Sequence, residues 1–269
     1  LDYKAHTRSV TVQYFALGGD HYIILCQNST QPTVNAHYGR ATIYQINTAT
    51  NKLGTKWETA DLRSLNRADI FVDGSKLVIT IPTNGLGVYT DANKSHCYDF
   101  DETNGFHNKR DVSILDGRTI FQSFVVGSER YAVSFEGVVG SNTFNQPSAT
   151  GLYRMKVCKW QTGSRTWGAF IDSMEFAQPL RAEWPTVFTH NGRIYLYFAG
   201  SAQRFTMFDE KEKRGVYLYE FEIAKMRFKM LDFIHQNGAW VSTSFIKDGK
   251  AYLATSAREH FLDTSLVYK

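Results

Sequence analysis

The stretch Phe15–Leu25 reads FALGGDHYIIL: an apolar run, a polar turn that contains glycine, and a second apolar run. The same phrase occurs four more times in the 269-residue chain, at Phe71–Ile79, Phe124–Val133, Phe188–Leu196 and Phe245–Leu253. Asn-Gly and Asp-Gly turns supply the positive φ angles of a tight connection between two antiparallel strands. Each copy therefore predicts a β-hairpin.

The hairpins recur at the spacing of a repeat protein. The turn glycines are 53 residues apart between Gly74 and Gly127 and 65 residues apart between Gly127 and Gly192, a period typical of propellers and arrays. A further alternating run follows each hairpin and predicts another strand. These runs are Ala41–Ile46, Ser95–Phe100, Gly151–Val157, Gly215–Phe221 and Thr264–Tyr268.

Small sheets that are repeated radially hide most of their strand edges. The sequence therefore predicts an all-β fold, a five-bladed β-propeller that forms a single domain over residues 1–269. An all-β chain of this length is commonly one domain, and no segment has the sustained periodicity of a helix.

The charge and the cysteines narrow the possible partners. The net charge of +4 is spread along the chain without a basic run, so we expect no nucleic-acid partner. No apolar run approaches membrane-spanning length, so we expect no membrane partner. Cys26, Cys97 and Cys158 are widely spaced and favour three buried cysteines over a metal site. We expect no cofactor, and the oligomeric state stays open.

In a propeller the first strand of each blade lines a central channel, and side chains near its beginning converge at one mouth, the default ligand site. The run before each turn glycine is the expected channel strand. The candidate residues are Asp2 to Thr7 in blade 1, Asn66, Arg67 and Asp69 in blade 2, Asp116, Arg118 and Thr119 in blade 3, Arg181, Glu183 and Trp184 in blade 4, and His235, Gln236 and Trp240 in blade 5.

Among these candidates, Glu183 has the most specific expected chemical role. A carboxylate beside Trp184 and ahead of an apolar strand favours a raised pKa, which suits a general acid. The alternative is a carboxylate at the rim that pairs with Arg181. Elsewhere, His96 and His107 lie in a segment rich in acidic residues, and a solvated loop is favoured there over a metal site.

The stretch Arg181–Phe198, RAEWPTVFTHNGRIYLYF, resembles the acid/base region of levansucrases and inulosucrases. The likeness continues through Gln203–Thr206 and Gly215–Tyr217, and the other hairpins are similar to those of the wider group of five-bladed furanosidases, which includes invertases and arabinanases. The resemblance implies a retaining glycoside hydrolase or fructosyltransferase that acts on a furanosyl, fructose-containing substrate. It also implies a small-molecule or oligosaccharide ligand and a secreted protein.

The resemblance assigns roles residue by residue. Glu183 matches the family's acid/base, and Asp2 matches the nucleophile that forms the covalent intermediate. Arg118 matches the arginine of the family's Arg-Asp-Pro motif, but Thr119 stands in place of its aspartate, with Asp116 as the nearby alternative. The residues implied to contact sugar are Arg67, Asp69, Arg118, Trp184, Arg204 and Trp240.

The departures from the family keep two other functions open. The hydroxyl of Thr119 can hydrogen-bond a sugar, but it cannot offset oxocarbenium charge as a carboxylate does. One alternative is therefore a catalytically degenerate propeller that binds sugar through aromatics such as Trp184 and Trp240. Another is a scaffold that binds a protein.

Overall fold

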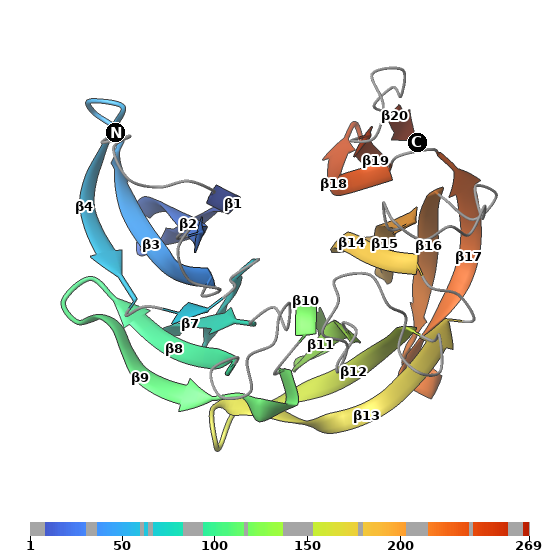
Figure 1. The fold of residues 1–269 in the computed structure, drawn as a ribbon, viewed down its shortest axis with the longest axis horizontal. Helices are drawn as coiled ribbons and strands as arrows, with labels where there is room; N and C mark the ends of the chain where they lie inside the picture. Colours follow the sequence, from blue (N-terminus) through green and yellow to red (C-terminus); the bar gives the residue numbers. More distant parts are fainter. Residues whose placement is uncertain are drawn as a thin grey trace. The chain divides into compact units, whose positions relative to one another are not determined.

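A computed structural model describes residues 9–30, 37–59, 62–63, 67–82, 94–115, 118–136, 153–176, 180–202, 215–236, 239–257 and 266–268. Within these residues the strands form five antiparallel sheets, and strand order within each sheet follows the sequence. The sheets succeed one another along the chain, from blue β1–β4 to red β18–β20 (Figure 1). We call each sheet a blade and number the blades in chain order.

The blades have the following strands. Blade 1 contains β1 (Ser9–Leu17), β2 (Asp20–Thr30), β3 (His37–Asn47) and β4 (Lys52–Glu58), with the short β5 (Leu62–Arg63) paired to β3. Blade 2 contains β6 (Asp69–Asp73), β7 (Lys76–Ile81), β8 (His96–Asp101) and β9 (Gly105–Asp111). Blade 3 contains β10 (Arg118–Val126), β11 (Glu129–Glu136), β12 (Tyr153–Gln161) and β13 (Thr166–Phe176).

The remaining elements complete the described chain. Blade 4 contains β14 (Leu180–His190), β15 (Arg193–Ala202), β16 (Gly215–Glu222) and β17 (Arg227–His235), and blade 5 contains β18 (Ala239–Lys247), β19 (Lys250–Ala257) and β20 (Leu266–Tyr268). Two 3₁₀ turns, Ser113–Leu115 and Ile223–Lys225, are the helical elements of the described residues. No helix among these residues is long and apolar enough to cross a membrane.

The predicted all-β propeller class is confirmed. The structure has four complete blades rather than the five that the repeats predict, because the last sheet, β18–β20, has three strands among the described residues. The predicted hairpin turns are present: His190 pairs with Arg193 across Asn191-Gly192, and both turn residues have positive φ, 49° and 74°. This is the geometry that an Asn-Gly turn favours.

The sequence did not distinguish the fourth strand of each blade. The outer strand β4 is exposed at all positions except the half-buried Trp57, and β17 buries only Phe228. Strands with so few buried positions lack the alternation of apolar and polar residues that predicts a half-buried strand.

Each hairpin carries an aromatic residue that faces the third position of the following strand. In four blades a phenylalanine stacks on a tyrosine seven residues later, across the hairpin. These pairs are Phe15–Tyr22, Phe124–Tyr131, Phe188–Tyr195 and Phe245–Tyr252, with ring centroids 5.1, 6.1, 5.3 and 5.1 Å apart. In blade 2, Phe71 lies opposite Val78 instead. Cross-strand aromatic pairs of this kind stabilise a hairpin.

The same phenylalanines join successive blades. Phe15 of blade 1 packs edge-on against Phe100 of blade 2, and Phe71 of blade 2 packs against Trp167 of β13. Phe124 of β10 contacts Phe221 and Phe228 on the outer strands of blade 4. In blades 1 to 3 the hairpin phenylalanine is therefore buried by aromatic residues on the third or fourth strand of the next blade.

The chain divides into two compact units, Leu1–Phe121 with Gln161–Trp167 (unit 1) and Gln122–Trp160 with Gly168–Lys269 (unit 2). In unit 1 the core gathers Tyr22, Ile24 and Ile43 of blade 1 with Ile79 and other residues of blade 2. In unit 2 a cluster of Tyr197, Ala199, Val216 and Leu253 joins blades 4 and 5. Cys26, Cys97 and Cys158 are buried, as predicted.

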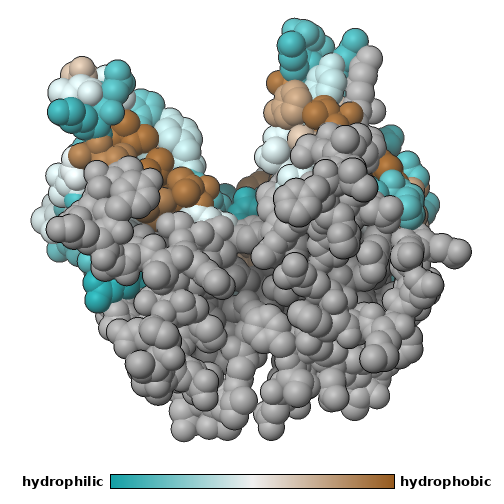
Figure 2. Space-filling model, turned by 45° about the horizontal axis from the view of Figure 1, so that its top comes forward, coloured by the Kyte–Doolittle hydropathy of each residue, from teal (hydrophilic) through white to brown (hydrophobic). Residues whose placement is uncertain are grey.

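Apolar side chains also reach the surface. Val12 and Tyr14 of β1 are exposed, and so are Phe245 and Ile246 of β18. In Figure 2 brown, hydrophobic surface lies over blade 1 at the left and over blade 5 at the right. Blade 5 thus buries its hairpin phenylalanine less completely than blades 1 to 3 do: Phe245 is 43% exposed and Phe124 is 6% exposed.

This difference predicts unequal costs of truncation. We expect Phe124→Ala to lower the free energy of unfolding by about 3 to 5 kcal/mol, because it leaves a cavity against Phe221 and Phe228. The matched variant Phe245→Ala should cost about 1 kcal/mol, since its ring keeps contact with water. Urea denaturation measures both values, and equal losses would contradict the packing described.

Candidate functional site

The predicted site residues lie near the beginning of the first strands. Asp69 is the first residue of β6, and Arg67 lies two residues before that strand. Arg118 and Thr119 begin β10, Glu183 and Trp184 lie in the first half of β14, and Trp240 is at the second position of β18. Only the backbone is described at residues 118–120, 180–184 and 239–242. Asp2, Asp116 and Arg204 lie outside the described residues, so the expected approach of Asp2 to Glu183 stays a prediction.

A β-bulge lies next to Glu183. Along β14 the partner of Glu183 is Ala199, and the next regular pair is Thr186 with Tyr197. Two residues, Trp184 and Pro185, thus oppose the single residue Phe198, and proline fits a bulge because it has no N–H to give to the ladder. A bulge re-aims the side chains around it, and bulges are frequent next to active sites.

Blade 5 has a second β-bulge, at its candidate residue Trp240. Ala239 pairs with Ala257 and Val241 pairs with Ser256, so Trp240 is the extra residue of a second bulge. β18 contacts both β14 and β15 within unit 2. The structure therefore brings two bulged segments, at Glu183–Trp184 and at Trp240, onto neighbouring first strands.

In unit 1 the candidates Arg67 and Asp69 form a charged, largely buried segment. Asp69 is 6% exposed, and Arg67 is half-buried. Burial lowers the pKa of Arg67, while the negative charge of Asp69 opposes that change. A carboxylate and a guanidinium at the beginning of a first strand supply an acceptor and donors for the hydroxyl groups of a ligand.

The thiol of Cys26 lies near this segment but has no nucleophilic role. Burial raises its pKa to about 11, although hydrogen bonds with Thr11 and with the backbone of Ala68 act in the opposite direction. A buried thiol with a raised pKa stays protonated at neutral pH and is inert.

Two other candidates of the predicted funnel lie at the end of β17. His235 is exposed, whereas Gln236 is buried and its amide oxygen accepts a hydrogen bond from the Thr255 hydroxyl at 2.5 Å. This contact links blade 4 to blade 5 and gives Gln236 a structural role.

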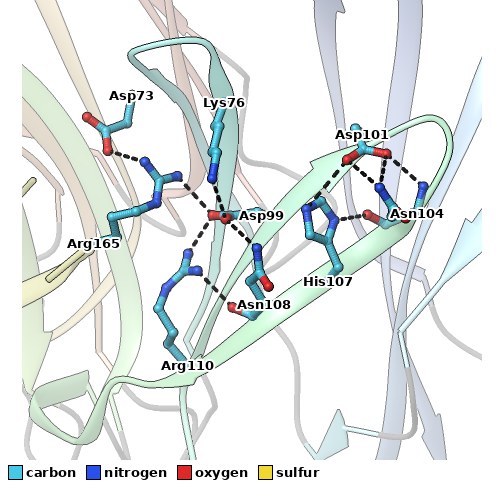
Figure 3. Close-up of polar contacts among 10 residues, drawn as sticks. Asp73, Lys76, Asp99, Asp101, Asn104, His107, Asn108, Arg110 and Arg165 are labelled. Carbon is cyan, nitrogen blue, oxygen red and sulfur yellow. Dashed lines mark hydrogen bonds and ion pairs between the residues drawn. The ribbon is translucent and has the colours of Figure 1, made fainter.

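The strongest polar network of the described residues was not predicted. It surrounds the buried carboxylate of Asp99 on β8, whose side chain is 2% exposed (Figure 3). Arg110 and Arg165 both donate to the same oxygen, Oδ1, at 2.8 and 2.9 Å, and Asn108 donates to Oδ2 at 3.0 Å. Arg165 also donates to Asp73 at 2.7 Å, so the turn Gln161–Trp167 is tied to blade 2 within unit 1.

The backbone around Asp99 is shaped for this network. Asn108 and Arg165 both have positive φ, 48° and 52°, a conformation uncommon for residues other than glycine. Burial alone would raise the pKa of Asp99, but the hydrogen bonds from Arg110, Arg165 and Asn108 outweigh it and hold this pKa well below its usual range. Asp99 is therefore ionised. Its hydrogen bonds to Asn108 and Arg165 offset the free energy that their positive φ angles cost.

The histidines of this region pair with separate carboxylates. His96 lies 3.0 Å from Asp111, and His107 lies 3.5 Å from Asp101. Burial lowers the pKa of His96, so it is neutral at neutral pH. No group of three or more His, Cys, Asp or Glu side chains in the described ranges is placed to hold a metal ion.

Comparison with known proteins identifies the fold and leaves the family open. No protein-family model matches the chain, and no curated protein matches its sequence. Among solved structures, a GH32 beta-fructofuranosidase of Bombyx mori is 13% identical with a TM-score of 0.53, over 94% of this chain and 57% of the enzyme. The chain thus spans little more than half the length of that protein.

Two further solved structures match over most of both chains. The alpha-L-arabinofuranosidase of Lactobacillus brevis is 11% identical with a TM-score of 0.57, over 98% of this chain and 91% of the enzyme. A GH43_1 enzyme of Xanthomonas citri, complexed with xylotriose, is 12% identical with a TM-score of 0.54, over 93% and 82%. The chain shares the propeller fold of these enzymes, which is a wider group than the levansucrases.

The Asp99 network predicts a stability effect. We expect Asp99→Ala to lower the free energy of unfolding by about 3 to 5 kcal/mol, because it leaves the Arg110 and Arg165 guanidinium groups without their buried partner. Glu129→Gln is the control, since the Glu129–Lys159 pair is exposed at the surface and such pairs contribute at most about 1 kcal/mol. Thermal or urea unfolding at pH 7 measures both.

The pH dependence of the free energy of unfolding, compared between the wild type and Asp99→Ala, gives a second prediction. A carboxyl whose folded pKa is depressed contributes stability above its unfolded pKa of about 4, and that stability is lost as the pH falls toward the folded pKa. The difference between wild type and Asp99→Ala should therefore be constant from about pH 5 to 8 and should shrink in acid. A difference that grows in acid would contradict the assigned charge of Asp99.

Proposed function

We propose that this protein is a carbohydrate-active enzyme, a glycoside hydrolase of the furanosidase type. The observation that carries the proposal is the bulge in β14, which lies beside Glu183 at the beginning of a first strand, in a propeller fold shared with GH32 and GH43 enzymes. The proposal includes one domain over residues 1–269, with β18–β20 as its fifth blade.

The proposed chemistry is retaining hydrolysis or transfer through a covalent intermediate. Glu183 protonates the leaving oxygen and then activates the acceptor, and Asp2 attacks the anomeric carbon, with the two carboxyl groups about 5 to 5.5 Å apart. Asp116 or Thr119 supplies the third contact to the reacting sugar. The contacts to the rest of the ligand are assigned to Arg67, Asp69, Arg118, Trp184, Arg204 and Trp240.

The proposed substrate is a furanosyl sugar that contains fructose, as the levansucrase-like stretch around Glu183 suggests. Sucrose and xylotriose are suitable first probes, because solved structures with this fold are described in complex with them. We place the protein outside the cell as part of the same proposal. The expected ligand is a small molecule or an oligosaccharide, without a cofactor.

Thr119 favours a second candidate function. A site without the third carboxylate retains hydrogen-bond donors and aromatic side chains but loses much of the stabilisation of the transition state. Such a site binds sugar without turnover. A protein-binding scaffold is the remaining alternative, and it requires neither sugar binding nor turnover.

Glu183→Gln tests the proposed role of the acid/base. Glutamine preserves the shape of the side chain but cannot give up a proton, so kcat on sucrose or another cleaved furanoside should fall by about 10² to 10⁴-fold. Release of reducing sugar measures turnover, and urea unfolding verifies that the fold is retained. Glu129→Gln is the matched control on an exposed hairpin and should keep wild-type turnover.

The outcomes separate the candidate functions. Full activity of Glu183→Gln would remove the acid/base assignment. Sugar binding by calorimetry without turnover in the wild type would favour the degenerate, sugar-binding propeller. Absence of both binding and turnover across sucrose, fructans, arabinosides and xylotriose would favour the protein-binding scaffold.

A further inference from the structure

The side chain of Gln122 makes an unusual pair of contacts with the strand that carries Glu183. Its amide oxygen accepts a hydrogen bond from the Val187 N–H at 3.0 Å, and its amide nitrogen donates to the Val187 carbonyl at 3.4 Å. Gln122 lies in β10 and Val187 in β14, and both belong to unit 2. The side chain thus makes the two bonds that a residue of a neighbouring strand would make.

Val187 offers these groups because β14 is the first strand of its sheet. In an antiparallel hairpin, hydrogen-bonded and non-hydrogen-bonded pairs alternate from the pair that closes the turn, which is here His190 with Arg193. Counting back, Val187 opposite Leu196 is a non-hydrogen-bonded pair, so its N–H and C=O face away from β15. A half-buried edge with unpaired backbone groups would be costly, and Gln122 pairs them.

The Gln122–Val187 contact lies close to the bulge in β14 and therefore to the candidate site. The bulge lies between Glu183 and Thr186, so the ladder with β15 is locally interrupted there. Val187 is the next residue after Thr186, and Gln122 holds it from the opposite edge of the strand. The direction in which β14 leaves the bulge toward Glu183 is therefore fixed from both edges.

We propose that Gln122 is a positioning residue, which holds β14 so that the Glu183–Trp184 segment has one fixed placement. The inference rests on the proposed function for the role of Glu183 in the reaction. A displacement of about 1 Å in a catalytic group can cost 10²-fold in rate. A side chain that has no contact with substrate can thus control turnover.

The repeat supports a role for this position on the first strand. Gln122 lies two residues before the hairpin phenylalanine Phe124. In the other blades the equivalent position also holds a side chain that can hydrogen-bond, namely Gln13, Asp69, Thr186 and Thr243. A side chain that can hydrogen-bond thus occurs two residues before the hairpin phenylalanine in all five copies.

Gln122→Met tests the inference, because methionine has a similar length but forms neither hydrogen bond. Three readouts are needed: hydrogen exchange at the Val187 amide, the backbone amide shifts of Glu183 and Trp184, and kcat with KM on sucrose. We expect Val187 protection to fall by at least about fivefold, the equivalent of two lost hydrogen bonds. The Glu183 and Trp184 shifts should move, and kcat should fall at least about tenfold with KM within about twofold.

The matched control is Gln161→Met, at the exposed end of β12, which should leave all three readouts at wild-type values. Gln122→Glu adds a rescue. The carboxylate keeps an acceptor for the Val187 N–H but has no N–H to donate to the Val187 carbonyl, so it retains one of the two contacts. Protection of Val187 in this variant should therefore stay higher than in Gln122→Met.

Each contrary result has a distinct meaning. Wild-type protection of Val187 in Gln122→Met would overturn the inference, and so would unchanged Glu183 and Trp184 shifts or unchanged kcat in an active protein. If the shifts move and protection falls, but the wild type turns over none of sucrose, fructans, arabinosides and xylotriose, the positioning stands and the proposed function fails.

Discussion

The hairpin phenylalanine is the contact on which the rest of the structure depends. A sheet of four strands cannot bury both of its faces, and Phe15, Phe71 and Phe124 are covered by aromatic residues from the outer strands of the following blade. The apolar area removed from water is thus shared between blades. Blade 5 shows the converse, because its hairpin phenylalanine is 43% exposed.

Aromatic packing leaves the polar backbone of the first strands to be paired by other means. Gln122 pairs the free edge of β14 at Val187, and the Tyr197 hydroxyl donates to the carbonyl of Thr243 on β18. The buried carboxylate of Asp99 likewise links strands to a turn, because it accepts hydrogen bonds from the guanidinium groups of Arg110 and Arg165. These polar contacts give each blade a defined register on its neighbour, which apolar contacts alone specify weakly.

The fold defines a class of protein without fixing its reaction. Propellers support many chemistries, so function has to be argued from the site. Here the bulges beside Glu183 and at Trp240 mark where first-strand backbones depart from the regular ladder. In the proposed function Thr119 takes the place of a carboxylate, and this residue is the point on which hydrolysis and simple sugar binding differ.

The sequence by itself determined the hairpins, their turns and the all-β class, because Asn-Gly or Asp-Gly turns and alternation are local signals that repeat. It also placed the candidate residues at the beginning of the first strands. It missed the outer strands, whose exposed faces carry no alternation, and it missed the bulge at Trp184-Pro185, which depends on pairing with β15. The roles of Gln122 and Asp99 were decided only by tertiary structure, since Val187 is 65 residues from Gln122 and Arg165 is 66 residues from Asp99. A polar residue at a repeated position was visible in the chain, but its partner exists only once one blade packs on the next.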